Sequence, residues 1–117
     1  MPTFRQGDVI KVPFPYTDRP TRQSRPAVVV STGGIEELHG LIWVTMVTSA
    51  ENRGWPGDVV IGNLAMAGLP AASVIRTAKI AAIEAGDATR LGRLSAPQRR
   101  QVVERLVREL APGTPGS

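Results

Sequence analysis

Short runs of apolar and β-branched residues, separated by proline and glycine, fill most of this 117-residue sequence. Such runs are too short for helices and suit the pleated surface of β-strands. They cover residues 9–12, 26–31, 41–48, 59–61 and 73–83, and the last two together supply two or three strands. The run at 26–31, PAVVVS, is apolar on both faces, as in a central strand. Several short strands with proline and glycine turns favour a small, strongly bent β-barrel or sandwich.

The spacing of the apolar residues changes after Ser95. Ser95 and Gln98 form a capping-box pattern, in which the serine hydroxyl accepts from the backbone amide three residues on. The apolar residues that follow share one helical face: Val102, Val103, Leu106, Val107 and Leu110. Opposite charges four residues apart occupy the other, solvated face. This pattern predicts one amphipathic helix that Pro112 and Gly113 end.

The length of the chain predicts one domain with one core. We take residues 1–110 as this domain and residues 111–117, APGTPGS, as a flexible tail. No apolar run approaches a membrane span and the N-terminus lacks the pattern of a signal peptide, so we expect a cytoplasmic protein without a membrane partner.

The charge balance is positive, and arginine supplies most of it. The formal net charge is +4, and the basic residues other than Lys11 and Lys79 are all arginine. Guanidinium groups bind phosphate through two parallel hydrogen bonds, which favours a phosphate-bearing partner. Coding bias in a GC-rich genome is the alternative explanation.

The residue inventory excludes several kinds of chemistry. The absence of cysteine rules out thiolate nucleophiles, disulfides and sulfur-ligated metals. His39 is the single histidine, which we expect in an exposed loop, so paired histidine acid and base catalysis is excluded as well. No nucleophile elbow, phosphate-cradling glycine motif or H-E-x-x-H occurs, which removes dehydrogenases, kinases and metalloproteases.

Arginine and hydroxyl side chains remain as candidates. Three arginines, Arg19, Arg22 and Arg25, lie on the connection before the second run. Further candidates follow at Thr48, Ser49, Arg53 and Arg76. An RNA phosphodiester can be cleaved by its own 2′-hydroxyl, and arginine and hydroxyl groups suit the stabilisation of the five-coordinate phosphorus. Charge for solubility alone, or binding without catalysis, is the alternative.

Four ordered blocks resemble one protein family. They are GDVIKVPFPYTDRPTRQSRPAVVVS, LIWVTMVTS, GLPAASVIRTAKIAAIE and LGRLSAPQRRQVVERLVREL, and the similarity runs from about residue 6 to about residue 110. In this order and spacing they resemble the MazF/PemK-like toxins of toxin–antitoxin systems. The resemblance implies a mainly β (α+β) fold, an SH3-like or CcdB-like β-barrel with a C-terminal helix. It also implies a homodimer and a cognate antitoxin that folds upon the toxin.

The activity implied by the resemblance is sequence-selective cleavage of single-stranded RNA without a metal or other cofactor. The expected products carry a 2′,3′-cyclic phosphate and a 5′-hydroxyl. Carried over residue by residue, Arg25 neutralises the phosphorane and Thr48 hydrogen-bonds a phosphate oxygen. Arg76 matches a catalytic arginine of PemK-type members, but these often carry an aspartate two residues later, where this chain has Ala78. The general acid and base are therefore left unassigned.

The remaining positions are expected to contact RNA. The RNA-binding candidates are Tyr16, Arg19, Arg22, Ser49, Arg53 and Lys79. Tyr16, together with Phe14, offers a ring on which a base can stack, although Phe14 serves the core equally well. Trp43 suits the core or a dimer interface, and Trp55 either covers the edge of the core or faces a partner.

Two other functions stay open on this fold. The first is a non-catalytic toxin that binds DNA gyrase, as CcdB relatives do; the helix ending VRELAPGTPGS lacks the aromatic and apolar end of those relatives. The second is an inactive nucleic-acid-binding module, an option that Ala78 supports and that the retained Arg25 and Thr48 oppose.

Overall fold

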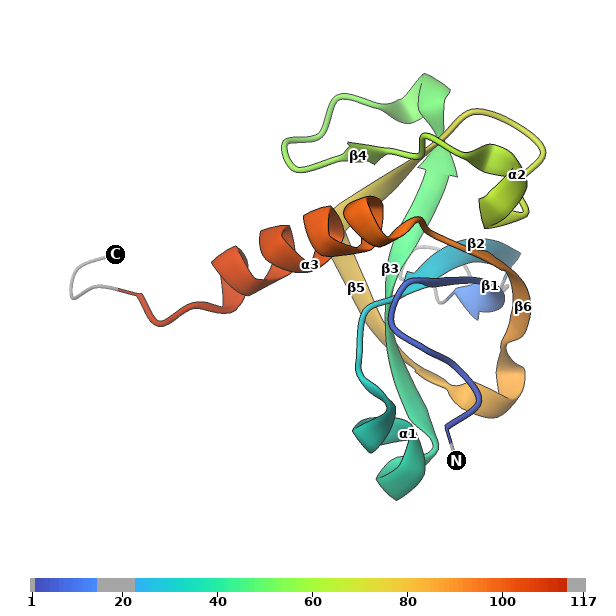
Figure 1. The fold of residues 1–117 in the computed structure, drawn as a ribbon, viewed down its shortest axis with the longest axis vertical. Helices are drawn as coiled ribbons and strands as arrows, with labels where there is room; N and C mark the ends of the chain where they lie inside the picture. The colour runs from blue at the N-terminus through green and yellow to red at the C-terminus, as the bar shows by residue number, and fades with distance from the viewer. Residues whose placement is uncertain (1, 15–22, 114–117) are drawn as a thin grey trace.

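The computed structural model describes residues 2–14 and 23–113. Within them, six strands form one antiparallel sheet in the order β4-β5-β3-β2-β1-β6. The strands are β1 (Asp8–Phe14), β2 (Gln23–Val29), β3 (Leu41–Ser49), β4 (Val59–Val60), β5 (Ser73–Glu84) and β6 (Thr89–Arg93). The sheet curls into a half-barrel along the long strands β3 and β5 (Figure 1). The predicted mainly β fold with a C-terminal helix is confirmed.

Helices and single turns connect the strands. The helices are α1 (Gly33–His39), α2 (Leu64–Ala67) and α3 (Ala96–Leu110), and the 3-10 turns are η1 (Ala50–Asn52) and η2 (Ala85–Asp87). The expectation of a loop around His39 was wrong, because His39 is the exposed last residue of α1. The sequence did not reveal α1, since none of its residues is buried and it therefore lacks an apolar stripe. None of the described helices is long and apolar enough to cross a membrane.

Two prolines lie inside strands at positions where no ladder hydrogen bond is lost. Pro13 pairs with β2, but the pairing of β1 with β6 ends at Lys11. Pro26 pairs with β1, and the β2–β3 pairs begin at Ala27. Each proline therefore has an open side on which its missing N–H is harmless, so β1 and β2 extend beyond the predicted runs.

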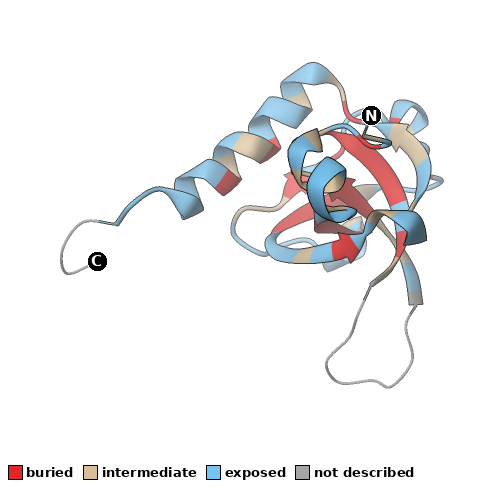
Figure 2. Cartoon of the chain, turned by 90° about the horizontal axis from the view of Figure 1, so that it is seen from below, coloured by how far each residue is buried: buried red, intermediate tan, exposed pale blue. Residues whose placement is uncertain are grey.

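The sheet buries apolar side chains on both faces. One cluster joins Val28, Val47 and Ile75 to Val102 and Leu106 of α3. The other cluster lies on the opposite face. Its members include Ile10, Val12, Ala27, Val44 and Met46. Figure 2 shows this burial along the strands, whereas most of α3 is exposed.

The start of α3 follows the predicted capping pattern in part. The Ser95 hydroxyl accepts from the Gln98 amide at 3.4 Å, as expected. The Gln98 side chain does not complete the box; it accepts from the Gly62 amide at 3.1 Å and donates to the Val60 carbonyl at 2.6 Å. The first turn of α3 is thereby attached to the end of β4. The C-terminal half of α3 projects beyond the sheet (Figures 1 and 2).

A close approach of α2 to β6 explains the glycine of the LGRL motif. A Cβ at Gly92 would lie 2.3 Å from the Met66 carbonyl oxygen and 2.5 Å from the Ala67 carbonyl carbon. Only glycine permits this contact between the two backbones. Neither α2 nor β6 was predicted from the sequence.

Strand β5 contains a bulge in its middle. Thr45 pairs with Ile80 and the next residue, Met46, pairs with Arg76, so residues 77–79 have no partner in β3. The Thr45 hydroxyl lies 2.7 Å from the Arg76 carbonyl and 3.0 Å from the Lys79 carbonyl, which are its acceptors. This buried hydroxyl closes the base of the bulge and satisfies backbone groups that the ladder leaves unpaired.

Candidate functional site

Three predicted site residues lie on adjacent strands and on one face of the sheet. Met46 of β3 pairs with Arg76 of β5, and Ala27 of β2 pairs with Met46. Arg25 and Thr48 each lie two residues from this pair along their strands, on the same faces as Ala27 and Met46. Paired residues share a face, and alternate residues of a strand return to it. We call this surface, defined by Arg25, Thr48 and Arg76, the site face.

Thr48 lies at the end of β3, with its side chain almost completely buried. Asn52 donates from Nδ2 to the Thr48 Oγ1 at 3.1 Å. The turn η1 between them begins at Ser49, whose Oγ accepts from the Glu51 amide at 3.3 Å. The hydroxyl of Ser49 therefore caps this turn and helps to bring Asn52 back over Thr48.

Arg76 is held by a set of contacts from the loop between β3 and β4. Its Nε donates to Asp58 Oδ1 at 3.3 Å and its Nη2 to Asp58 Oδ2 at 3.1 Å. The same Nη2 donates to the Asn52 carbonyl. The Trp55 ring centre lies 4.2 Å from the guanidinium carbon. The side chains of Arg76 and Asp58 are only 7% and 9% exposed, so this ion pair is largely shielded from water.

Exposed cationic and aromatic side chains surround this buried pair. Arg53 follows η1 and is exposed, and Trp55 is 46% exposed. The Lys79 Nζ lies 5.5 Å from the centre of the Trp55 ring. Such a combination of a ring face and two positive charges can stack on a base and neutralise phosphates.

Three predicted RNA-binding residues lie outside the described residues: Tyr16, Arg19 and Arg22. Phe14 is the last residue of β1, and Arg25 lies on β2 with intermediate exposure. The structure thus brings together Arg25, Thr48 and Arg76 from the predicted list.

Two residues of the site were missed by sequence reasoning. Asn52 and Asp58 lie 24 and 18 positions before Arg76, their shared partner. No local motif links such distant positions, and only the loop sequence NRGWPGD was noticed, for its tryptophan. Among the described residues, no group of three or more His, Asp or Glu side chains lies close enough to bind a metal ion.

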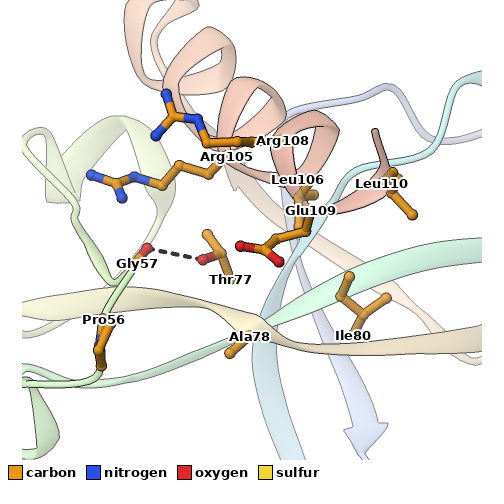
Figure 3. A pocket seen from close by; sticks show the side chains of 10 residues that line it. All are labelled: Pro56, Gly57, Thr77, Ala78, Ile80, Arg105, Leu106, Arg108, Glu109 and Leu110. Atoms are coloured by element: carbon orange, nitrogen blue, oxygen red, sulfur yellow. Dashed lines mark hydrogen bonds between the residues drawn. The ribbon is translucent and has the colours of Figure 1, made fainter. Parts of the chain in front are cut away.

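Two clefts lie between α3 and β5. The first, of about 500 Å³, lies between the C-terminal half of α3 and residues of the bulge. Figure 3 shows Arg105 and Arg108 on its helix side and the Glu109 carboxylate pointing toward Thr77, which donates to the Gly57 carbonyl. The second, of about 530 Å³, is mainly apolar. The exposed large apolar side chains in its lining are Trp43, Ile80, Val107 and Leu110.

Comparisons with known proteins agree with this architecture. A family model described as PemK-like, MazF-like toxin of type II toxin–antitoxin system matches residues 5–110. No curated protein matches the chain.

Solved structures share the fold over almost the whole chain. The MazE–MazF complex of Deinococcus radiodurans (Form II) matches with a TM-score of 0.71 at 22% identity, covering 93% of this chain and 96% of that one. An endoribonuclease in complex with its cognate antitoxin, from a mycobacterial species, gives 0.74 at 16% identity, covering 96% and 100%. The Mycobacterium tuberculosis toxin MazF-mt6 gives 0.69 at 18% identity, covering 92% and 99%. At these identities the likeness shows the fold.

Proposed function

The chain belongs to the PemK-like, MazF-like toxins of type II toxin–antitoxin systems, and on that basis we propose that it is a metal-independent endoribonuclease. Its substrate is single-stranded RNA, cut at selected sequences. The observation that carries this proposal is the site face, to which Arg25 of β2, Thr48 of β3 and Arg76 of β5 all belong. A guanidinium and a hydroxyl on one face suit the two non-bridging oxygens of a phosphorane, which lie in its equatorial plane.

The proposed reaction is an internal transfer at phosphorus. The 2′-oxygen of the RNA attacks the neighbouring phosphorus and loses its proton, while the bond from phosphorus to the 5′-oxygen breaks and that oxygen gains a proton. The products are a 2′,3′-cyclic phosphate and a 5′-hydroxyl. Arg25 neutralises the charge that develops on the phosphorane, and Thr48 donates a hydrogen bond to a non-bridging oxygen. The exposed Arg53, Trp55 and Lys79 bind the flanking nucleotides.

The proposed partners are a cognate antitoxin and a second copy of the chain. A relative of this fold was solved in complex with its cognate antitoxin, which supports the first. The apolar cleft supports the second, because Trp43, Ile80, Val107 and Leu110 leave a large apolar surface in water beside the projecting end of α3. We assign this surface to the homodimer.

The test is cleavage of a long single-stranded RNA by purified protein in the presence of EDTA, with product ends mapped. Discrete cuts that carry cyclic phosphate are expected, and both Arg25→Ala and Thr48→Ala should slow their formation to a small residual rate. Arg93→Ala, which removes an exposed arginine from β6, is the matched control and should keep full activity. Intact RNA from folded, unmodified protein would refute the ribonuclease and leave gyrase binding or an inactive module, which a supercoiling assay separates.

A further inference from the structure

We propose that Asn52 is a positioning residue that orients the Thr48 hydroxyl toward the scissile phosphate, and that Arg76 acts through Asn52. This inference rests on the proposed ribonuclease function. It concerns an unbroken chain of contacts: Asp58 to Arg76, Arg76 to the Asn52 carbonyl, and the Asn52 amide to Thr48.

The direction of the last hydrogen bond determines what Thr48 can do. A threonine hydroxyl has one proton to donate and two lone pairs, whereas an amide nitrogen only donates. Because Asn52 Nδ2 donates to Thr48 Oγ1, the single Thr48 proton is directed to another acceptor. The described residues provide no second hydrogen-bond partner for Oγ1. A non-bridging phosphate oxygen on the site face is an acceptor of the required kind.

Arg76 is placed to fix Asn52 rather than to meet the substrate. Asp58 occupies its Nε and Nη2, and Nη2 also reaches the Asn52 carbonyl. Trp55 covers one face of the guanidinium. These contacts occupy two of the three nitrogens of Arg76 and one of its faces. Its charge instead holds the backbone of Asn52 against β5.

The turn that carries Asn52 is short, and its other contacts are the Ser49 cap and backbone hydrogen bonds at Ala50. It is a three-residue 3-10 turn without a buried residue, and Asn52 itself is exposed. A short exposed turn adopts several conformations unless specific contacts select one. Contacts at both the carbonyl and the amide of Asn52 select the conformation in which Thr48 is bonded. Arg76 in turn is paired with the carboxylate of Asp58, which lies in the loop before β4. Position 78, where PemK-type members often carry an aspartate, is alanine in this chain.

The experiment is a double-mutant cycle on the rate of RNA cleavage. Asn52→Ala, Thr48→Ala and the double variant are compared with the unmodified protein, using an oligoribonucleotide that contains a mapped cut site. Asn52→Ala should lower kcat by roughly tenfold to a hundredfold, the equivalent of one lost hydrogen bond, with little change in KM. In the Thr48→Ala background, Asn52→Ala should have almost no further effect on the residual rate.

A second variant tests the direction of the bond. Asn52→Asp has nearly the same shape, but its carboxylate only accepts, so it takes the Thr48 proton and should lower kcat at least as much as alanine does. Full kcat in Asn52→Asp would overturn the proposed direction. Unchanged kcat in Asn52→Ala, or effects of the two alanine variants that multiply, would overturn the positioning role while the ribonuclease stands. Absence of cleavage by the unmodified protein refutes the proposed function itself.

Discussion

Removal of the Arg76 guanidinium should destabilise the fold far more than removal of any exposed arginine. In Arg76→Met the Asp58 carboxylate, 9% exposed, keeps its charge but loses its partner. Breaking a buried ion pair in this way costs about 3–5 kcal/mol, because the Asp58 carboxylate then keeps a hydrogen bond from the Trp55 amide, at 3.3 Å, but has no opposite charge beside it. A domain of this size has a total stability of about 5–15 kcal/mol. The loss corresponds to a decrease in Tm of about 10–20 °C.

The assay is urea unfolding followed by circular dichroism, with two comparison variants. Arg93→Met removes an exposed arginine of β6 that forms no ion pair among the described residues. Its expected cost is at most about 0.5 kcal/mol. Adding Asp58→Asn to Arg76→Met should recover part of the loss, because the stranded charge is then removed. Equal costs for the two arginine variants, or no recovery in the double variant, would refute the argument that burial controls the energy of the Arg76 pair.

Two further predictions concern the dimer and the response to acid. Val107→Glu should convert a homodimer into a monomer in sedimentation analysis, because it places a charge on the apolar surface; an unchanged species would exclude that surface. Burial raises the pKa of the Glu36 carboxyl, but hydrogen bonds from the Thr3 and Phe4 amides outweigh it and leave this pKa below its ordinary value of 4.5. The carboxylate therefore stabilises the fold above the unfolded pKa and loses this effect as the pH falls through the folded pKa. The difference in unfolding free energy between the unmodified protein and Glu36→Gln should be smaller at pH 3 than at pH 7, and equal differences would contradict this.

The sequence predicted those parts of the fold that bury a regular apolar pattern. The central strands β2 and β3 and the helix α3 carry β-branched runs or a helical stripe, and they form the core. The parts that were missed lack such a pattern. Strand β6, TRLGR, is mostly exposed, and α1 buries no residue. Their positions depend on contacts with distant segments, such as the approach of α2 to Gly92, which no local propensity reports.

The residues of the candidate site likewise include some that the sequence predicted and others that it did not. Arg25, Thr48 and Arg76 were proposed from motif blocks, and the strand register explains why residues so far apart in sequence share one face. Their supporting residues were not found, because Asn52 and Asp58 contact them through hydrogen bonds from a short turn and a loop. A polar side chain in a loop carries no periodicity, so only its spatial neighbours show its role.

The bulge in β5 is a place where residues can be inserted or deleted without a shift of the β3–β5 register. The β3–β5 register is fixed independently on each side, by Thr45 with Ile80 and by Met46 with Arg76. A residue inserted or deleted within 77–79 alters the size of the bulge and leaves both registers unchanged, so every core side chain keeps its face. The exposed Lys79 beside Trp55 is carried by this same segment. The segment 77–79 can therefore acquire insertions and deletions while the barrel behind it retains its packing.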